Sequence, residues 1–243
     1  AIYEGSALPA RYNGRLFAAA PLQSEVVLSR LEPDRSSFKT SDEGRPMKST
    51  DPWFRPVDMK LGPDGAVYVA DFYNRIIGHY EVPLQHPDRD RTRGRIWRVT
   101  YKDGVRKASR NASRWNWQDA SIGQLIEDLG HPNLTVRRIA ADQLADRWQH
   151  EAVGPVKAML QDENASAAQR VQGLWILHRL GHLKTAQLAA AVAEDSNRSI
   201  RVHAMRILAQ QSPPYGDAER ELALEGLRDP DALIQRLAAE AVG

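Results

Sequence analysis

Apolar and polar residues alternate in short runs through the first part of the chain, and this pattern predicts β-strands. The clearest run is residues 66–71, where Val67 and Val69 alternate with a tyrosine and an alanine and give the strand two different faces. Glycine and proline bound most of the runs, as is typical of strands joined by turns. The predicted strands are residues 15–20, 25–31, 54–59, 66–71, 75–82 and 95–101.

A proline–aspartate–glycine turn joins two of these strands. Pro63 presets the backbone for the second position of the turn, and Gly65 closes it. Four short consecutive antiparallel strands form one blade of a β-propeller, and four of the predicted strands lie between residues 54 and 101. We therefore expect residues 1–104 to form the last one or two blades of a β-propeller, with the earlier strands supplying part of the second blade.

The second half of the chain changes to the pattern of amphipathic helices. A block with a small residue in its middle and an aliphatic residue at its end recurs at a spacing of roughly 31–34 residues, the period range of helical solenoids. The small residues should let neighbouring helices approach closely, and the aliphatic residues should fill a shared core. The small residues are Ala140, Gly173, Ala204 and Ala238, and the aliphatic residues are Leu144, Leu177, Leu208 and Val242.

Another helix is predicted before each block, with a polar segment between the two. An arginine is the second residue of the first three blocks, at Arg137, Arg170 and Arg201. This pattern resembles HEAT or HEAT-like repeats, so we expect an α-solenoid over residues 119–243 and a linker over residues 105–118. The fold class predicted is thus mixed β and α, a partial β-propeller followed by an α-solenoid. The predicted first helices are residues 123–129, 153–160, 185–193 and 217–227.

Composition narrows the range of functions only slightly. The formal net charge is +2, with 42% hydrophobic and 26% charged residues, which is ordinary for a globular protein. No basic tract marks a nucleic-acid surface, so nucleic acid is not an expected partner. The chain has no cysteine, which excludes disulfides, thiolate metal sites and covalent c-type haem attachment within these residues. No apolar run of about 18 residues is present, so no membrane span is predicted.

The first candidate site is the cluster of Asp51, Trp53, Phe54, Arg55 and Asp58. At the mouth of a propeller, Arg55 would bind a carboxylate or quinone oxygen, Trp53 would stack on a sugar or cofactor ring, and an aspartate would help to hold a metal. Alternatively, the charged residues form a structural ion pair above a buried aromatic ring, since structural ion pairs perturb charged groups much as active sites do. The residues leave both interpretations open.

A second candidate group contains Asp71, Tyr73, Asn74 and His79. His79 could act as a general base or as a metal ligand, because imidazole titrates near neutral pH. It could equally be a histidine within a strand, bonded to a neighbouring segment. We favour the second interpretation because no other histidine lies at a suitable spacing.

A histidine pair in the helical half is the third candidate. His178 and His182 are four residues apart, a spacing that places both side chains on one face of a continuous helix, where they could hold a metal. Gly181 interrupts that helix near its end, and no third ligand is evident. No metal site is therefore predicted.

Five motifs lie between residues 50 and 101. They are Asp51-Pro-Trp-Phe-Arg-Pro-Val-Asp58, Gly62-Pro-Asp-Gly65, Tyr68-Val-Ala-Asp-Phe-Tyr-Asn74, Ile77-Gly-His-Tyr80 and Gly94-Arg-Ile-Trp-Arg-Val99. Together they resemble the end of the propeller in a family of large planctomycete-type proteins, the membrane-bound or PVC-type dehydrogenases with a haem-binding domain. The order of propeller and then HEAT-like repeats is also similar, so the resemblance covers essentially the whole chain.

The resemblance implies a fragment of a quinoprotein-like sugar or alcohol dehydrogenase, because such propellers are similar to glucose and sorbosone dehydrogenases that use pyrroloquinoline quinone (PQQ) and calcium. It implies a carbohydrate-like small molecule as substrate and a cytochrome c domain, carrying haem c, or another protein as partner. It also implies a periplasmic or secreted location. The substrate- or cofactor-binding residues it suggests are Trp53, Arg55, Asp58, Asp71 and His79; the catalytic residues of such enzymes reside largely in earlier blades.

A different class of function is a non-catalytic scaffold, in which a degenerate propeller and a HEAT-like adaptor bind a glycan or a protein. The chain starts at Ala1 and its last predicted helix stops at Gly243, so we expect a piece of a longer polypeptide that has no turnover and no cofactor by itself. A catalytic histidine with convergent arginines upstream, and a Cys-x-x-Cys-His motif downstream, would favour the enzyme. Their absence would favour the scaffold.

Overall fold

The computed structural model describes the whole chain except residues 79–80, 103–115, 194–195, 212–215 and 243. The contacts between residues divide the chain into two compact units, each with hydrophobic packing of its own. The sheet unit comprises the described residues of Ala1–Glu32, Lys39–Ser113 and Pro132–Thr135. The helical unit comprises those of Pro33–Phe38, Arg114–His131 and Val136–Gly243.

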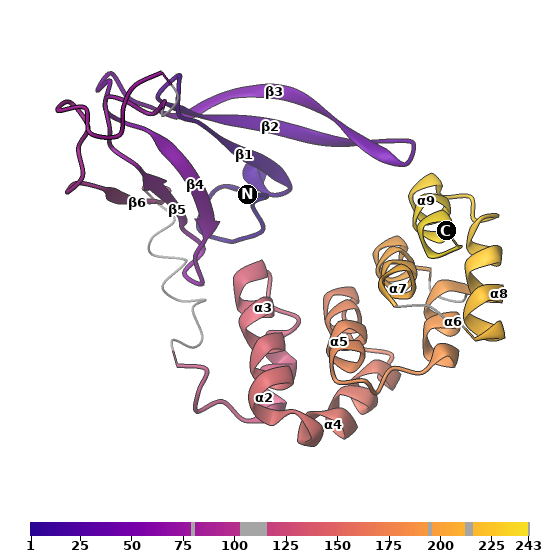
Figure 1. The fold of residues 1–243 in the computed structure, drawn as a ribbon. Helices are drawn as coiled ribbons and strands as arrows, with labels where there is room; N and C mark the ends of the chain where they lie inside the picture. The colour runs from indigo at the N-terminus through magenta and orange to yellow at the C-terminus, as the bar shows by residue number, and fades with distance from the viewer. Residues whose placement is uncertain (79–80, 103–115, 194–195, 212–215, 243) are drawn as a thin grey trace. The chain divides into compact units, whose positions relative to one another are not determined.

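The first of two antiparallel sheets consists of β1 (Arg15–Ala20), β2 (Glu25–Asp34) and β3 (Ser37–Lys48), in that order (Figure 1). β1 and β2 pair in a register that places Phe17 opposite Leu28, and both side chains are buried. β1 has the predicted range, and β2 begins where predicted but continues three residues further, to Asp34. β3 is polar and almost entirely exposed, so no hydrophobic alternation predicts it.

The second sheet consists of β4 (Pro56–Leu61), β5 (Val67–Asp71) and β6 (Arg95–Val99), again in chain order. The predicted turn joins β4 to β5. Gly65 has a φ of +80°, a conformation that glycine adopts without strain, and its N–H donates to the carbonyl of Gly62 at 2.9 Å. The strands predicted around this turn are confirmed to within two residues.

The predicted partial β-propeller is wrong. Each described sheet has three strands rather than the four of a blade, and neither sheet closes or curls (Figure 1). β1 packs against β4, and one hydrophobic cluster joins the two sheets. The apolar faces of the strands are thus buried between two small sheets, which is the simplest way for such faces to leave water. The cluster consists of Tyr3, Phe17, Val26, Leu28, Met59, Val67 and Val69.

The strand predicted over residues 75–82 is also wrong for the part of it that the structure describes. The guanidinium of Arg89 donates to the carbonyl oxygens of Gly78 and Val82, the latter at 2.7 Å. These backbone groups are therefore bonded within their own loop and do not pair with a neighbouring strand. The side chain of Arg89 thus stabilises a loop in a segment where the apolar pattern predicted a strand.

Eight α-helices lie in the described part of the second half (Figure 1). The predicted helices are confirmed at these positions, whereas their assignment to HEAT-like repeats stays a prediction. A π-helical segment, η2 (Gln143–Trp148), continues α3. The helices are α2 (Ile122–Asp128), α3 (Leu134–Asp142), α4 (His150–Gln161), α5 (Ala167–Arg179), α6 (Thr185–Ala193), α7 (Arg198–Gln210), α8 (Asp217–Gly226) and α9 (Ala232–Val242).

Two of the helices begin at a reciprocal cap. Ser121 before α2 and Ser166 before α5 each accept a hydrogen bond from a backbone N–H three residues later, at Gln124 and Gln169, and each glutamine side chain bonds back. The second helices α5, α7 and α9 pack against one another in sequence, and the first helices α6 and α8 also contact each other.

The predicted small residues are all buried in the helical core. At Gly173, a side-chain carbon would lie 2.8 Å from Met159 Cε and 2.9 Å from Leu160 Cδ2, so these side chains of α4 would have to shift to admit a larger residue on α5. The predicted core positions Leu144, Leu177 and Leu208 are completely buried. Val242 is not a core residue as predicted. It is 49% exposed, because no described helix packs over that side of α9.

Candidate functional site

Asp71, at the end of β5, is a buried acceptor that joins three segments of the sheet unit. Its Oδ1 accepts hydrogen bonds from the backbone N–H groups of Arg55 and Tyr73 at 2.8 and 2.9 Å. Its Oδ2 accepts one from Trp97 Nε1 at 3.0 Å. The residue is only 3% exposed, so these donors compensate its burial. The carboxylate therefore holds the loops around β5 together.

Arg55 lies beside Asp71 and bonds to neutral oxygen atoms. Its Nε donates to the carbonyl of Asn74 at 3.1 Å, and its Nη1 donates to Pro21 O and Ser24 Oγ at 2.8 and 3.1 Å. Its Nη2 donates to Arg75 O at 3.4 Å. The side chain ties two loops of the sheet unit to each other. It forms no ion pair with a described residue, and the ligand contact expected from the sequence stays a prediction.

Trp53 belongs to a stack of rings and guanidinium groups that we call the arginine–aromatic cluster: Trp53, Tyr73, Arg93, Arg95 and Trp97. The rings of Trp53 and Tyr73 have centroids 5.6 Å apart. Arg93 lies 5.1 Å from the centroid of Trp53, and Arg95 lies 3.5 Å above that of Tyr73. Tyr73 has a φ of +45°, an uncommon backbone conformation for tyrosine that the bond to Asp71 supports. The cluster uses its cations to cover its own rings.

The remaining predicted site residues do not join this group. Asp58 is exposed and pairs with Lys60 Nζ at 3.1 Å. The hydrogen bond from Lys60, and then that from the N–H of Met59, lower the pKa of Asp58. His79 lies outside the described residues. The structure thus brings Trp53, Arg55 and Asp71 into one region and leaves Asp58 apart from it.

Asp90 closes the loop that leads into β6. It accepts hydrogen bonds from the backbone N–H groups of Thr92 and Arg93 at 2.9 and 3.0 Å, and from the Arg93 guanidinium. These bonds, that from the Thr92 N–H foremost, lower the pKa of Asp90 to about 2. The backbone carbonyl of Asp90 accepts from Asn74 Nδ2 at 2.7 Å, which fixes the loop to the end of β5.

A hollow of about 520 Å³ lies beside β6. Val57, Phe72 and Ile96 line it and are 52%, 47% and 75% exposed. Its charged lining consists of three arginines and two aspartates, namely Arg91, Arg93, Arg95, Asp71 and Asp90. Exposed apolar side chains and charged side chains therefore lie next to one another around this hollow. We call this region the β6 hollow.

The PQQ, calcium and haem c that the resemblance implies stay predictions. Arg55 donates its hydrogen bonds to backbone and hydroxyl oxygens of the sheet unit. Among the residues that the structure describes, no three His, Cys, Asp or Glu side chains are placed to hold a metal ion together.

The helical unit has a second hollow, of about 430 Å³, between α3, η2 and α5. Ala141, Ala145 and Ile176 contribute apolar side chains to it, and Trp175 and Arg138 also line it. We call these five residues the Trp175 surface. The indole ring of Trp175 is half-buried. Its Nε1 donates a hydrogen bond of 3.0 Å to Nδ1 of His203 on α7, and this bond fixes the orientation of the ring.

Two histidines lie beside Trp175. One is His203, and the other is His178, whose ring is edge-on to the indole with centroids 5.9 Å apart. Burial lowers the pKa of His178, and burial together with the charge of Arg206 lowers the pKa of His203. A neutral His203 can accept the indole N–H, since its Nδ1 then carries a lone pair. The pair considered from the sequence is not formed: His182 lies beside His150 instead, with ring centroids 5.9 Å apart.

The sequence reasoning missed Trp175 because it treated the repeated block as core. In the alignment of the blocks, Trp175 takes the position that Asp142 and Arg206 occupy in the neighbouring blocks, and both of those are exposed. A large aromatic side chain at a position where the neighbouring blocks carry a charged residue was a signal for a surface site. No comparable signal marked the arginine–aromatic cluster as a unit, because its members come from three separate segments.

Comparison with known proteins gives two matches. Residues 1–103 match a family described as a domain of unknown function (DUF7133). A protein of Pseudanabaena tenuis, described as uncharacterized phycocyanin operon protein Z, is 27% identical over 128 residues. That alignment covers 51% of this chain and 62% of the relative, so the chain spans less than two thirds of the protein it resembles.

The sequence predicts no membrane-spanning segment, and the lengths and hydropathy of the described helices bear on this prediction. None of those in the described part of the chain is both long enough and apolar enough to cross a bilayer.

Proposed function

We propose that the protein is a binding scaffold and that its helical unit takes up a segment of another protein at the Trp175 surface. The observation that carries this proposal is the hollow of about 430 Å³ between α3, η2 and α5, with a half-buried tryptophan in its lining. Such a hollow can accept one apolar side chain of a partner. The proposal corresponds to the non-catalytic alternative that the sequence left open.

The chemistry of the lining supports a protein ligand. Tryptophan and arginine are enriched among the residues that contribute most to protein interfaces. Trp175 offers a large rigid ring whose orientation is already fixed by its hydrogen bond to His203, so little conformational entropy is lost when a partner covers it. Ala141 and Ala145 are small and leave room above the helices.

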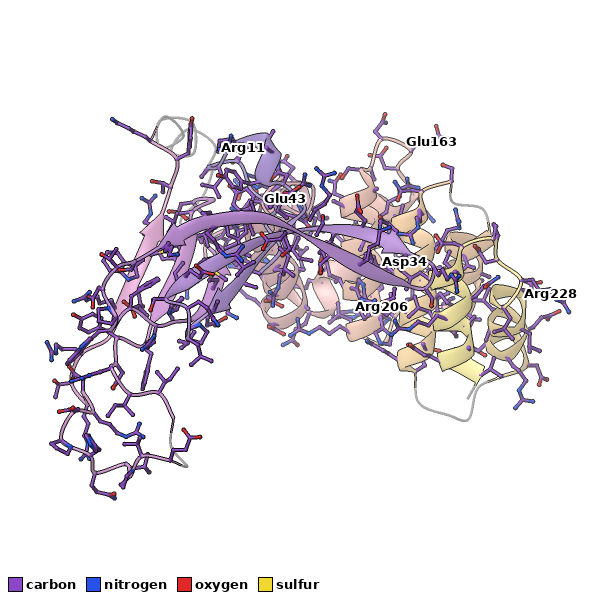
Figure 2. All side chains as sticks on the ribbon, turned by 90° about the horizontal axis from the view of Figure 1, so that it is seen from above. Arg11, Asp34, Glu43, Glu163, Arg206 and Arg228 are labelled. Carbon is purple, nitrogen blue, oxygen red and sulfur yellow. The ribbon has the colours of Figure 1, made fainter. Side chains whose placement is uncertain are left out.

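The charges around the hollow favour a segment with acidic residues. Arg138 lines the hollow and is exposed, and it has no ion pair to a described residue. Arg206, labelled on α7 in Figure 2, is likewise exposed without such a pair, and it lies near His203. Arg179, in contrast, pairs with Asp142 and Asp146 at 2.9 and 2.6 Å. The unpaired arginines leave positive charge for a partner to neutralise.

The dehydrogenase that the resemblance implies stays a prediction, together with its PQQ, calcium, haem c and carbohydrate-like substrate. The periplasmic or secreted location has the same standing. The proposal made here concerns the helical unit and does not depend on that activity.

A peptide selection with the full chain tests the proposal. Displayed random peptides would be selected on the wild-type protein, and their affinity measured for Trp175→Ala, Trp175→Phe and Arg228→Ala. We expect roughly tenfold or greater loss for Trp175→Ala, because truncating a central aromatic contact typically costs 2 kcal/mol or more. Trp175→Phe should lose less.

Arg228 is the matched control, because it is an exposed arginine (Figure 2) that does not line the hollow. Its replacement should leave the affinity unchanged. Selection that yields no peptide, or peptides that bind Trp175→Ala as well as wild type, would refute the proposed site. Circular dichroism of each variant ensures that a loss of binding is not a loss of fold.

A further inference from the structure

The outer edge of β6 is unpaired among the residues that the structure describes. β6 is the last strand of the β4–β5–β6 sheet, and all of its residues except Val99 are exposed. In an antiparallel sheet, every second residue of an edge strand directs its N–H and C=O away from its neighbour. An open edge of this kind can pair with another extended segment, and soluble proteins usually protect it.

Apolar side chains accompany this edge. Ile96 is the most exposed large apolar residue in the described part of the sheet unit, at 75%, and it faces the β6 hollow together with Val57 and Phe72. Val57 lies at the irregularity in the β4–β5 register, between Pro56 and Asp58. A strand added beside β6 would find room for apolar side chains in this hollow.

The charge around the edge is positive. Residues 86–98 contain five arginines and two aspartates. Arg89 and Arg91 donate to backbone carbonyls, Arg91 to Leu84 O at 2.7 Å, so these bonds leave their charge without an anionic partner. Arg93 is neutralised by Asp90 and Arg98 by Asp64, the latter at 2.7 Å, whereas Arg95 is no closer than 4.0 Å to Asp51. An anionic ligand would therefore be attracted to this edge.

We propose that β6 binds an extended acidic segment of a partner protein as a fourth strand of the β4–β5–β6 sheet. The backbone of that segment bonds to the outer edge of β6, which no described strand occupies. Its apolar side chains enter the hollow beside Ile96, and its carboxylates meet Arg91 and Arg95. Strand addition to an open edge is a recurring mode of peptide recognition, in which backbone bonds give affinity and side-chain pockets give specificity.

A peptide fits this edge better than a nucleic acid, although both are anionic. Single-stranded nucleic acids bind by stacking their bases on open aromatic rings. Here Arg95 lies over the ring of Tyr73, and Arg93 lies near both Trp53 and Tyr73. The exposed apolar side chains of the hollow suit aliphatic residues instead. The site lies in the sheet unit and does not rest on the binding proposed for the helical unit.

Binding of a short synthetic peptide to the full chain tests this inference. The probe is a labelled peptide in which valine and glutamate alternate, followed by fluorescence anisotropy. A second peptide has the same charges but carries N-methyl groups on alternate backbone nitrogens. Because strand addition needs those N–H donors, we expect the methylated peptide to bind roughly tenfold more weakly or worse. This comparison uses only the wild-type protein, so it does not depend on the folding of a variant.

Two variants locate the site. Arg91→Glu should weaken the peptide by roughly tenfold through charge reversal, and Ile96→Gln should weaken it by several-fold through loss of the apolar contact. The matched controls are Lys39→Glu, an exposed cation on β3, and Leu22→Gln, which is 72% exposed between β1 and β2. Both controls should bind as wild type does.

Several results would overturn the inference. They are the absence of peptide binding, equal binding of the methylated peptide, equal losses in the controls, and tighter binding of a thymidine oligonucleotide than of the peptide. Size-exclusion chromatography with light scattering adds one more: a dimer of wild type that Ile96→Gln dissolves would show that a second copy of this chain, and not an acidic partner, occupies the edge.

Discussion

The loops around β5 in the sheet unit and the contacts between helices in the helical unit use charged side chains in different ways. In the sheet unit, Arg55 and Arg89 donate to backbone carbonyls, and Asp71 accepts from backbone N–H groups. Between neighbouring helices of the helical unit, charged side chains pair with one another, as Arg179 does with Asp142. Arg198 likewise pairs with the carboxylate of Asp231 across such a gap.

This difference follows from where backbone hydrogen bonds are made. A helix satisfies its backbone groups internally except at its ends, so its charged side chains remain on the surface. The loops of the sheet unit have no regular partner, and their buried carbonyls and N–H groups must be satisfied by side chains. A conspicuous polar cluster in a loop is therefore as typical of backbone closure as of catalysis. That lesson applies to the residues predicted as a site around Arg55.

The largest expected difference in unfolding free energy is between substitutions of Asp71 and Asp58, which were both predicted as binding residues. Asp71→Ala should lower the free energy of unfolding by about 3 kcal/mol, because it leaves buried donors, among them Trp97 Nε1, without an acceptor. Asp58→Ala should change it by less than about 0.5 kcal/mol, because Asp58 is exposed. Urea unfolding followed by circular dichroism measures both. Equal effects would show that Asp71 does not brace the sheet unit.

The second prediction compares the loss of stability on replacing Arg55 in the sheet unit with that on replacing Arg179 in the helical unit. Arg55→Gln should cost about 1–2 kcal/mol, because it removes hydrogen bonds to part-buried backbone carbonyls. Arg179→Gln should cost about 0.5 kcal/mol or less, because its bonds to Asp142 and Asp146 are between exposed side chains. Thermal and urea unfolding of the two variants against wild type provides the measurement. A larger loss for Arg179→Gln would contradict the contrast drawn between the units.

The smallest expected effect is the loss of folding stability when the Asp90 carboxylate is protonated at low pH. Hydrogen bonds from the Thr92 N–H and then from Arg93 lower the pKa of Asp90 to about 2, below the ordinary value near 4. A carboxylate whose pKa is lower in the folded state adds stability above its ordinary pKa, and this contribution is lost as the pH falls from about 4 to about 2.

Nuclear magnetic resonance titration of the Asp90 carboxyl carbon measures this pKa directly. Arg93→Gln should raise it only in part, because the Thr92 N–H remains. Thr92→Val, which keeps that N–H and removes the hydroxyl donor, serves as the matched control and should raise it less. A pKa near 4 in the wild type would show that the loop before β6 is not closed by this carboxylate.

Most of the helical unit was predictable from the sequence. Each helix is specified by local signals, such as the cap at Ser166 and the spacing of small and aliphatic residues through Gly173 and Leu177. Hydrogen bonds within a helix join residues four apart, so a short window of sequence contains most of the information needed. Exposure of Val242 escaped prediction because it depends on what packs over α9 and not on α9 itself.

The sheet unit was predictable only in its parts. Local alternation placed β1, β2 and β5, and the turn at Gly65 joined β4 to β5 as expected. β3 and the loop containing Gly78 escaped prediction, because a strand is completed by partners far along the chain. The propeller was inferred from the number of predicted strands in series, and the loss of one strand to a loop closed by Arg89 removed its basis.

The sequence by itself determined where the helices lie and which strands carry apolar faces. Only the tertiary structure decided that Arg55 and Asp71 satisfy backbone groups, that the two small sheets share one core, and that Trp175 is held by His203 beside an open hollow. The physical reason is that a side chain's role depends on which donor or acceptor reaches it first, and those partners come from segments that the local pattern does not connect.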